Sequence, residues 1–99
     1  MKEVILEGRR MTSREAAQEQ LQEKLALPSY YGRNLDALWD CLTERPETVV
    51  VFRHPGAMLS ALREYGCRLL QTFFEAEREN PALHVVIGNH SASETEGCR

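Results

Sequence analysis

The chain has 99 residues, of which 42% are hydrophobic and 27% charged, and its formal net charge is −3 at pH 7. This length predicts one domain with a modest core, and the mild acidity argues against a nucleic-acid binder, which usually carries a basic patch. No apolar run approaches the ~20 residues of a membrane span, and acids interrupt the N-terminus from Glu3 onward, unlike a signal peptide. We therefore expect a cytoplasmic protein that contacts neither membranes nor nucleic acids directly.

The first quarter of the chain predicts a strand and then a helix. Residues 3–6 form a short aliphatic run typical of a strand, and residues 8–10 predict a turn. Thr12-x-x-Glu15 has the form of a capping box, in which both side chains satisfy free backbone N–H groups, so a helix should begin there and run to about Leu25. Its apolar positions form a thin stripe at spacing four, which predicts a peripheral helix: Ala17, Leu21 and Leu25.

A second helix is predicted over residues 35–43. Pro28 ends the approach to it, Gly32 permits a turn that residues with a Cβ resist, and Asn34 is a good N-cap. The spacing i, i+3, i+4, i+7 defines an apolar stripe of Leu35, Leu38, Trp39 and Leu42. An adjoining polar stripe consists of Asp36, Asp40 and Thr43.

The second half of the chain continues the alternation of strands and helices. Residues 48–52 are continuously apolar, which is typical of a strand buried on both faces of a parallel sheet. Pro55 and Gly56 break this strand. One helix is predicted over 57–65, with Gly66 just past its end, and a second helix over 67–79. Residues 83–87 predict a third strand, and the polar composition predicts a disordered tail over 90–99. The order predicts an α/β fold with a three-stranded parallel sheet and about four helices.

Few residues have a spacing typical of a catalytic, cofactor or metal site. Glycine-rich phosphate-binding loops and CxxC or Cys/His spacings are lacking, and no catalytic partner can be named for any of the three His, so we expect no cofactor and no metal. Asp36 and Asp40 could be paired catalytic carboxylates, but such groups usually need an enclosed site. The local pattern by itself favours a solvated acidic helix face, with Arg33 shielding Asp36, because charged helix faces are common. Together with Tyr30, Tyr31 and Trp39, which are typical interface anchors, the two acids could also form a recognition patch.

The segment from Leu27 to Thr43, LPSYYGRNLDALWDCLT, resembles the signature of the barstar family, intracellular protein inhibitors of secreted ribonucleases such as barnase. The match is long, gapless and rich in rare residue types. From about Lys2 to Asn89, the rest of the chain is similar to the family in the order and length of its elements. The resemblance implies a single barstar-like domain over residues 1–89, and it favours the recognition patch over the solvated face.

The resemblance also implies a function and a set of contacts. It implies a protein without enzymatic activity that binds a cationic, extracellular-type ribonuclease one to one and occludes its active site. A further acid lies on the fourth helix of the family, and Glu75 matches it in the register Phe73-Phe74-Glu75-Ala76. The remaining contacts, carried over by motif position, are Tyr30, Tyr31, Gly32, Asn34, Leu35, Asp36, Trp39, Asp40 and Thr43.

Three residues depart from the family pattern as the resemblance presents it. Glu44 and Arg45 follow the motif where barstar has Gly and Trp, and Arg33 replaces an acid. The two arginines add positive charge near the site, which leaves the identity of the target open. Two alternatives therefore stay open: a protein-binding or regulatory module that keeps this fold without a ribonuclease target, and, more remotely, an enzyme that uses the Asp pair.

Overall fold

A three-stranded parallel sheet forms the centre of the fold in the computed structural model, which describes residues 2–88. The predicted α/β architecture, with three parallel strands and four α-helices, is confirmed within these residues, whereas the predicted tail lies outside them. The elements in chain order are β1 (Lys2–Glu7), the 3-10 helix η1 (Gly8–Arg10), α1 (Arg14–Lys24), α2 (Leu35–Thr43), β2 (Thr48–Arg53), α3 (Pro55–Leu62), α4 (Glu64–Glu79) and β3 (Leu83–Gly88).

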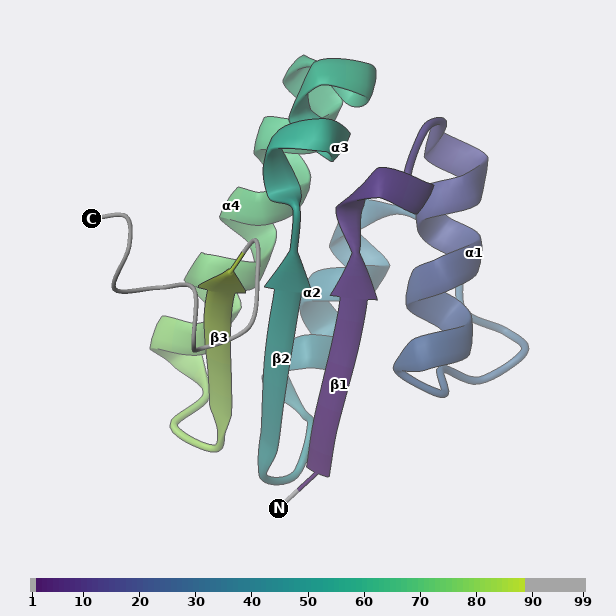
Figure 1. The fold of residues 1–99 in the computed structure, drawn as a ribbon. Coiled ribbons are helices and arrows are strands. Elements are labelled where there is room, and N and C mark those ends of the chain that lie inside the picture. Colours follow the sequence, from purple (N-terminus) through teal and green to yellow (C-terminus); the bar gives the residue numbers. More distant parts are fainter. Residues whose placement is uncertain (1, 89–99) are drawn as a thin grey trace.

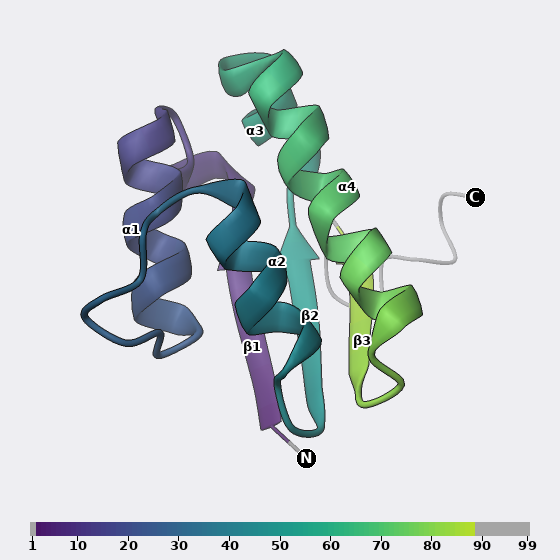
Figure 2. The same ribbon diagram turned by 180° about the vertical axis from the view of Figure 1, so that it is seen from behind.

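The helices lie on one side of the sheet and at its ends. Strand β2 lies between β1 and β3, with Val50 paired to Val4 and Val85 in register. Helices α2 and α4 cover one face of the sheet (Figure 2), α1 lies beside β1, and α3 follows the carboxyl end of β2 (Figure 1). The core fills the space between the sheet and the helices, and its largest fully buried side chains are Phe52, Phe73, Leu6, Met11, Leu21, Leu25, Leu38, Leu42, Met58, Leu69 and Leu83.

The opposite face of the sheet has no helix over it among residues 2–88, so the prediction that β2 is buried on both faces was wrong. Val50 and Phe52 are fully buried, but Val51 is only partly buried and lies in register with Ile5 and Val86, which are 47% and 48% exposed. The strand order explains this one-sidedness. Both crossovers move in the same direction across the sheet, and right-handed crossovers of that kind place their helices on the same face.

Three predicted helix boundaries were wrong. The N-cap of α1 is Ser13, whose Oγ accepts from the Ala16 N–H at 3.0 Å, so the capping box at Thr12 does not form. Helix α3 ends at Leu62 because Arg63 adopts a left-handed φ of 58°. Gly66 therefore lies inside α4 instead of past a helix end, and a Cβ there would approach the Leu59 Cα to 3.4 Å. Its lack of a side chain lets α3 and α4 pack closely.

Candidate functional site

Helix α2 begins as predicted, and its first turn is closed by a side chain. Asn34 is the N-cap, with an extended backbone and its Oδ1 accepting from the Ala37 N–H at 2.7 Å. The residue with a left-handed φ directly before this cap is Arg33, with φ of 55°, and not Gly32 as the sequence suggested. A Cβ at Gly32 would lie 3.0 Å from Asn34 Nδ2, so this glycine instead leaves room for the capping side chain.

The loop before α2 is fixed by a buried tyrosine. Tyr31 is 7% exposed, and its hydroxyl donates to Gln18 Oε1 at 2.5 Å, while Gln18 Nε2 donates to the Tyr65 hydroxyl at 2.7 Å. This chain of hydrogen bonds joins the loop to α1 and α4. Burial raises the pKa of Tyr31 above its ordinary value. The structure therefore places Tyr31, one of the expected contacts, beneath the surface, whereas its neighbour Tyr30 is 86% exposed.

The other end of α2 is fixed by Asn80, which follows α4. Asn80 is 7% exposed, and its Nδ2 donates to the carbonyls of Leu42 at 2.9 Å and Arg45 at 3.1 Å. The Leu42 carbonyl also accepts from the Arg45 N–H at 3.3 Å, so Asn80 adds a side-chain bond to the backbone turn that ends the helix. Helix α2 is therefore capped at its start by the neighbouring Asn34 and bonded at its end by the distant Asn80, which makes it a well-anchored support for exposed side chains.

The polar stripe of α2 faces solvent. Asp36 and Asp40 are exposed, and the partly buried Thr43 donates its hydroxyl to the Asp40 carbonyl at 3.0 Å. Neither carboxylate takes part in an ion pair within residues 2–88. Arg33, expected to shield Asp36, instead donates from Nε to Gln22 on α1 at 2.8 Å. Two exposed carboxylates thus lie on this helix without a cationic partner among residues 2–88.

The remaining predicted contacts flank this stripe. A shallow groove lined by Tyr30, Gly32 and Asp40 runs between the loop and the Ala37 side of α2. Helix α4 packs on the other side of α2 (Figure 2). The helical spacing directs Leu35 and Trp39 to that same side, where Leu35 is half-buried against the core and Trp39 is 36% exposed. Glu75 is exposed on α4. The loop, α2 and α4 thus present the predicted residues across one broad surface, with Tyr31 beneath it.

Arg45 does not add free charge at the rim of this surface, in contrast to the sequence-based expectation. Its side chain is half-buried, and Nη1 donates to the Leu25 carbonyl at the end of α1 at 2.7 Å. Burial lowers the pKa of the guanidinium below its ordinary value. Arg45 thus serves to join the end of α2 to the end of α1.

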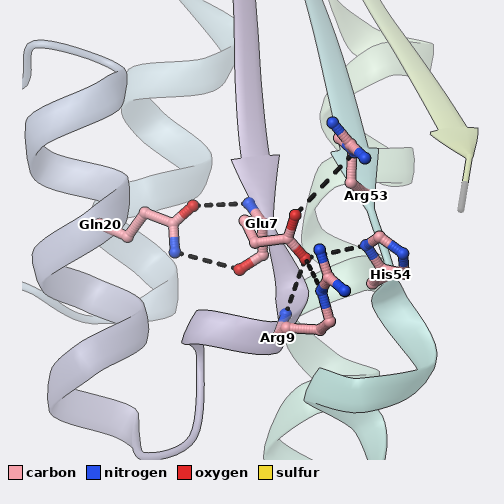
Figure 3. Close-up of polar contacts among 5 residues, drawn as sticks. All are labelled: Glu7, Arg9, Gln20, Arg53 and His54. Atoms are coloured by element: carbon pink, nitrogen blue, oxygen red, sulfur yellow. Dashed lines mark hydrogen bonds and ion pairs between the residues drawn. The ribbon is translucent and has the colours of Figure 1, made fainter. Parts of the chain in front are cut away.

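A polar cluster that the sequence did not predict lies at the carboxyl ends of β1 and β2 (Figure 3). Glu7 Oε2 is 3.0 Å from His54 Nδ1 and 3.2 Å from Arg9 Nε, and Glu7 Oε1 is 3.9 Å from Arg53 Nε. Burial by itself raises the pKa of Glu7, but hydrogen bonds from Arg9 and His54 outweigh it and lower that pKa. Gln20 of α1 closes the cluster by bonding both the N–H and the carbonyl of Glu7, at 2.6 and 3.2 Å.

The Glu7 cluster joins elements of the fold. The Glu7 carboxylate and the His54 imidazole are 3.0 Å apart and bond each other, which ties the carboxyl end of β1 to that of β2. The only sequence signal was position: Glu7 is the last residue of β1, His54 directly follows β2, and the parallel register pairs Glu7 with Arg53.

Neither a metal centre nor a membrane span is found among the residues that the structure describes. Within residues 2–88, no group of three or more His, Cys, Asp or Glu side chains could hold a metal ion. Over the same range, none of the helices combines the length and the apolarity needed to cross a membrane. The broad surface formed by the loop before α2, by α2 and by α4, hereafter the α2 surface, is the strongest candidate site of the described chain.

Comparison with known proteins shows the class of protein. A family model described as Barstar (barnase inhibitor) matches residues 1–88, so the chain belongs to the barstar family. It is also 39% identical over 84 residues to the Bacillus subtilis (strain 168) protein named "Putative ribonuclease inhibitor YrdF". That match covers 80% of this chain and 89% of the relative. The resemblance identified in the sequence is thereby confirmed.

Proposed function

We propose that this protein inhibits a cationic, secreted-type ribonuclease by binding it one to one and covering its active site. The observation that carries the proposal is the pair of exposed carboxylates, Asp36 and Asp40, on a helix held at both ends. Within the part of the chain that the structure describes, neither carboxylate has an ion-pair partner. A ribonuclease binds a polyanion, so its active site gathers cationic side chains. A carboxylate on a rigid support can occupy the place of the scissile phosphate.

The contact surface extends from the loop across α2 to α4. Tyr30 and Trp39 supply aromatic area at low entropic cost, which is typical of residues that dominate binding energy. Tyr31 acts from below by holding the loop. Inhibition needs only occlusion, so no catalytic group is invoked, and such an inhibitor would act in the cytoplasm, before the ribonuclease is exported. The surface residues proposed to touch the ribonuclease are Tyr30, Gly32, Asn34, Leu35, Asp36, Trp39, Asp40, Thr43 and Glu75.

The test is titration of a ribonuclease with the purified protein. Two probes are suitable: barnase, and the basic secreted ribonuclease recovered from the source organism with this chain as bait at low salt. We expect activity to fall to zero at one equivalent. Asp40→Ala should weaken inhibition at least about 100-fold, equivalent to about 2.7 kcal/mol. The control Glu19→Gln removes an exposed charge from α1 and should inhibit like the parent.

Two results would overturn the proposal. One is a parent protein that inhibits neither ribonuclease. The other is an Asp40→Ala variant that inhibits as strongly as the parent. Capture of a protein without ribonuclease activity in the same pull-down would instead favour the binding-module alternative.

A further inference from the structure

A second recognition feature adjoins the α2 surface. A pocket of about 460 Å³ opens between α1, the loop before α2 and the first turns of α4. Its walls carry three guanidinium groups, from Arg14, Arg33 and Arg68, and two carboxylates, from Glu15 and Asp36. The pocket is therefore a basic site at the edge of an acidic surface.

The floor of this pocket is preorganised. Gln18 is 3% exposed and is bonded on one side to Tyr31 and on the other to the hydroxyl of Tyr65. The Arg14 Cζ lies 4.5 Å from the centroid of the Tyr65 ring, a cation–π contact that orients its guanidinium over the floor. A bound group would thus meet at least one cation that is already in place, which reduces the entropic cost of binding.

The three guanidinium groups are available to an external acceptor. All ion pairs within residues 2–88 involve Glu7, so none of the three arginines has a carboxylate within 4.0 Å. All three residues are exposed, and Arg33 uses Nε for Gln22. Guanidinium groups bind carboxylates in a bidentate manner with defined geometry. Three arginines against two acids leave one net positive charge on the walls, which matches a single carboxylate better than a polyanion.

We propose that this pocket receives an acidic side chain of the partner ribonuclease and so acts as a specificity determinant beside the α2 surface. The inference rests on the proposed function. Asn34, Leu35 and Asp36 belong to both the pocket and the proposed contact surface, so a partner seated on α2 also covers the pocket. A ribonuclease with a carboxylate at this place gains ion pairs, whereas one with a neutral or basic residue there leaves desolvated guanidinium groups behind.

Charge reversal with a matched control tests the proposal in the complex with the ribonuclease. Arg68→Glu and Arg78→Glu make the same change on exposed positions of α4, about 15 Å apart along the helix axis. We expect Arg68→Glu to raise the dissociation constant for the inhibited ribonuclease at least tenfold more than Arg78→Glu does. Arg14→Gln, which keeps the size of the side chain, should weaken binding in the same direction. A scan of the acids around the ribonuclease cleft to Lys should find one change that restores affinity to Arg68→Glu.

A second measurement needs no ribonuclease. The tripeptide acetyl-Gly-Glu-Gly-amide is titrated into the protein while the Arg Nε–H NMR signals are followed, with acetyl-Gly-Gln-Gly-amide as the neutral control. We expect the acidic peptide to shift the signals of Arg14, Arg33 and Arg68 and to leave that of Arg78 in place. Equal shifts at Arg78, or equal effects of the two peptides, would overturn the pocket as a carboxylate site.

The two arms distinguish the failure of this inference from failure of the proposed function. If the parent inhibits the ribonuclease and Arg68→Glu binds it as Arg78→Glu does, the pocket inference is wrong and the inhibitor proposal stands. If the parent inhibits neither ribonuclease, the proposed function is wrong, and with it the assignment of the carboxylate to a ribonuclease.

Discussion

Tyr30 and Tyr31 are adjacent in the sequence but face opposite environments, so exchanging each in turn separates binding from stability. Tyr31→Phe removes the donor that satisfies Gln18 Oε1 inside the protein. A buried acceptor left without a partner costs about 1–3 kcal/mol. For a domain of this size each kcal/mol lowers Tm by about 4–8 °C. We therefore expect a loss of roughly 5–20 °C in Tm, with little change in ribonuclease inhibition.

The matched variant is Tyr30→Ala. Its side chain is 86% exposed, so removing it should change the free energy of unfolding by less than about 0.5 kcal/mol. Because it is proposed to anchor the partner, its loss should weaken inhibition roughly tenfold or more. Urea unfolding and ribonuclease titration on both variants measure the two quantities separately. A Tyr31→Phe variant that is as stable as the parent, yet inhibits poorly, would refute the assignment of Tyr31 as a support of the loop.

The same substitution has a signature in pH. The pKa of Tyr31 is raised in the folded protein, mainly by burial, above the value of about 10 that an unfolded chain has. The contribution of the protonated Tyr31 phenol to the free energy of unfolding is therefore complete below pH ~10. It is lost as the pH rises above that value, because the phenol of the unfolded chain releases its proton first. Thermal unfolding between pH 8 and 11 should show a steeper loss of stability for the parent than for Tyr31→Phe. Parallel curves would contradict the burial of the phenol.

Three further predictions concern association, packing and the thiol in α2. The association rate with the ribonuclease should fall steeply between 0.01 and 1 M salt, because the Debye length shrinks from about 30 to about 3 Å, while the dissociation rate changes much less. Stopped-flow mixing that follows Trp39 fluorescence measures both rates. An association rate that does not depend on salt would argue against a cationic partner. Gly8→Ala should destabilise the protein by about 3 kcal/mol or more, because a Cβ there would lie 2.1 Å from the His54 carbonyl oxygen. Gly56→Ala is the control in thermal unfolding, since nothing lies within 4 Å of the added Cβ. Cys41→Ala should cost on the order of 1 kcal/mol of stability and leave the equivalence point of inhibition unchanged, since the half-buried Cys41 packs against the core and not on the polar stripe.

Local sequence signals were sufficient for the α2 helix and for the order of the elements. The cap at Asn34 and the two stripes of α2 depend on residues within two turns of each other, and both were confirmed. The strands are also recognisable from local sequence, because turn residues bound each apolar run. The family resemblance rested on one gapless segment and is confirmed by the match over residues 1–88.

The tertiary structure decided which of these residues are free to act. Tyr31 is buried because Gln18 lies beneath it, and Gln18 is itself bonded to Tyr65, 47 residues further along the chain. Arg45 joins the end of α1 because the Leu25 carbonyl lies 2.7 Å from its guanidinium, a contact across 20 residues. The open face of the sheet follows from the strand order, which spacing along β2 does not encode. Burial and charge pairing depend on neighbours distant in sequence, so a periodic pattern predicts an element but not the partners that its side chains will meet.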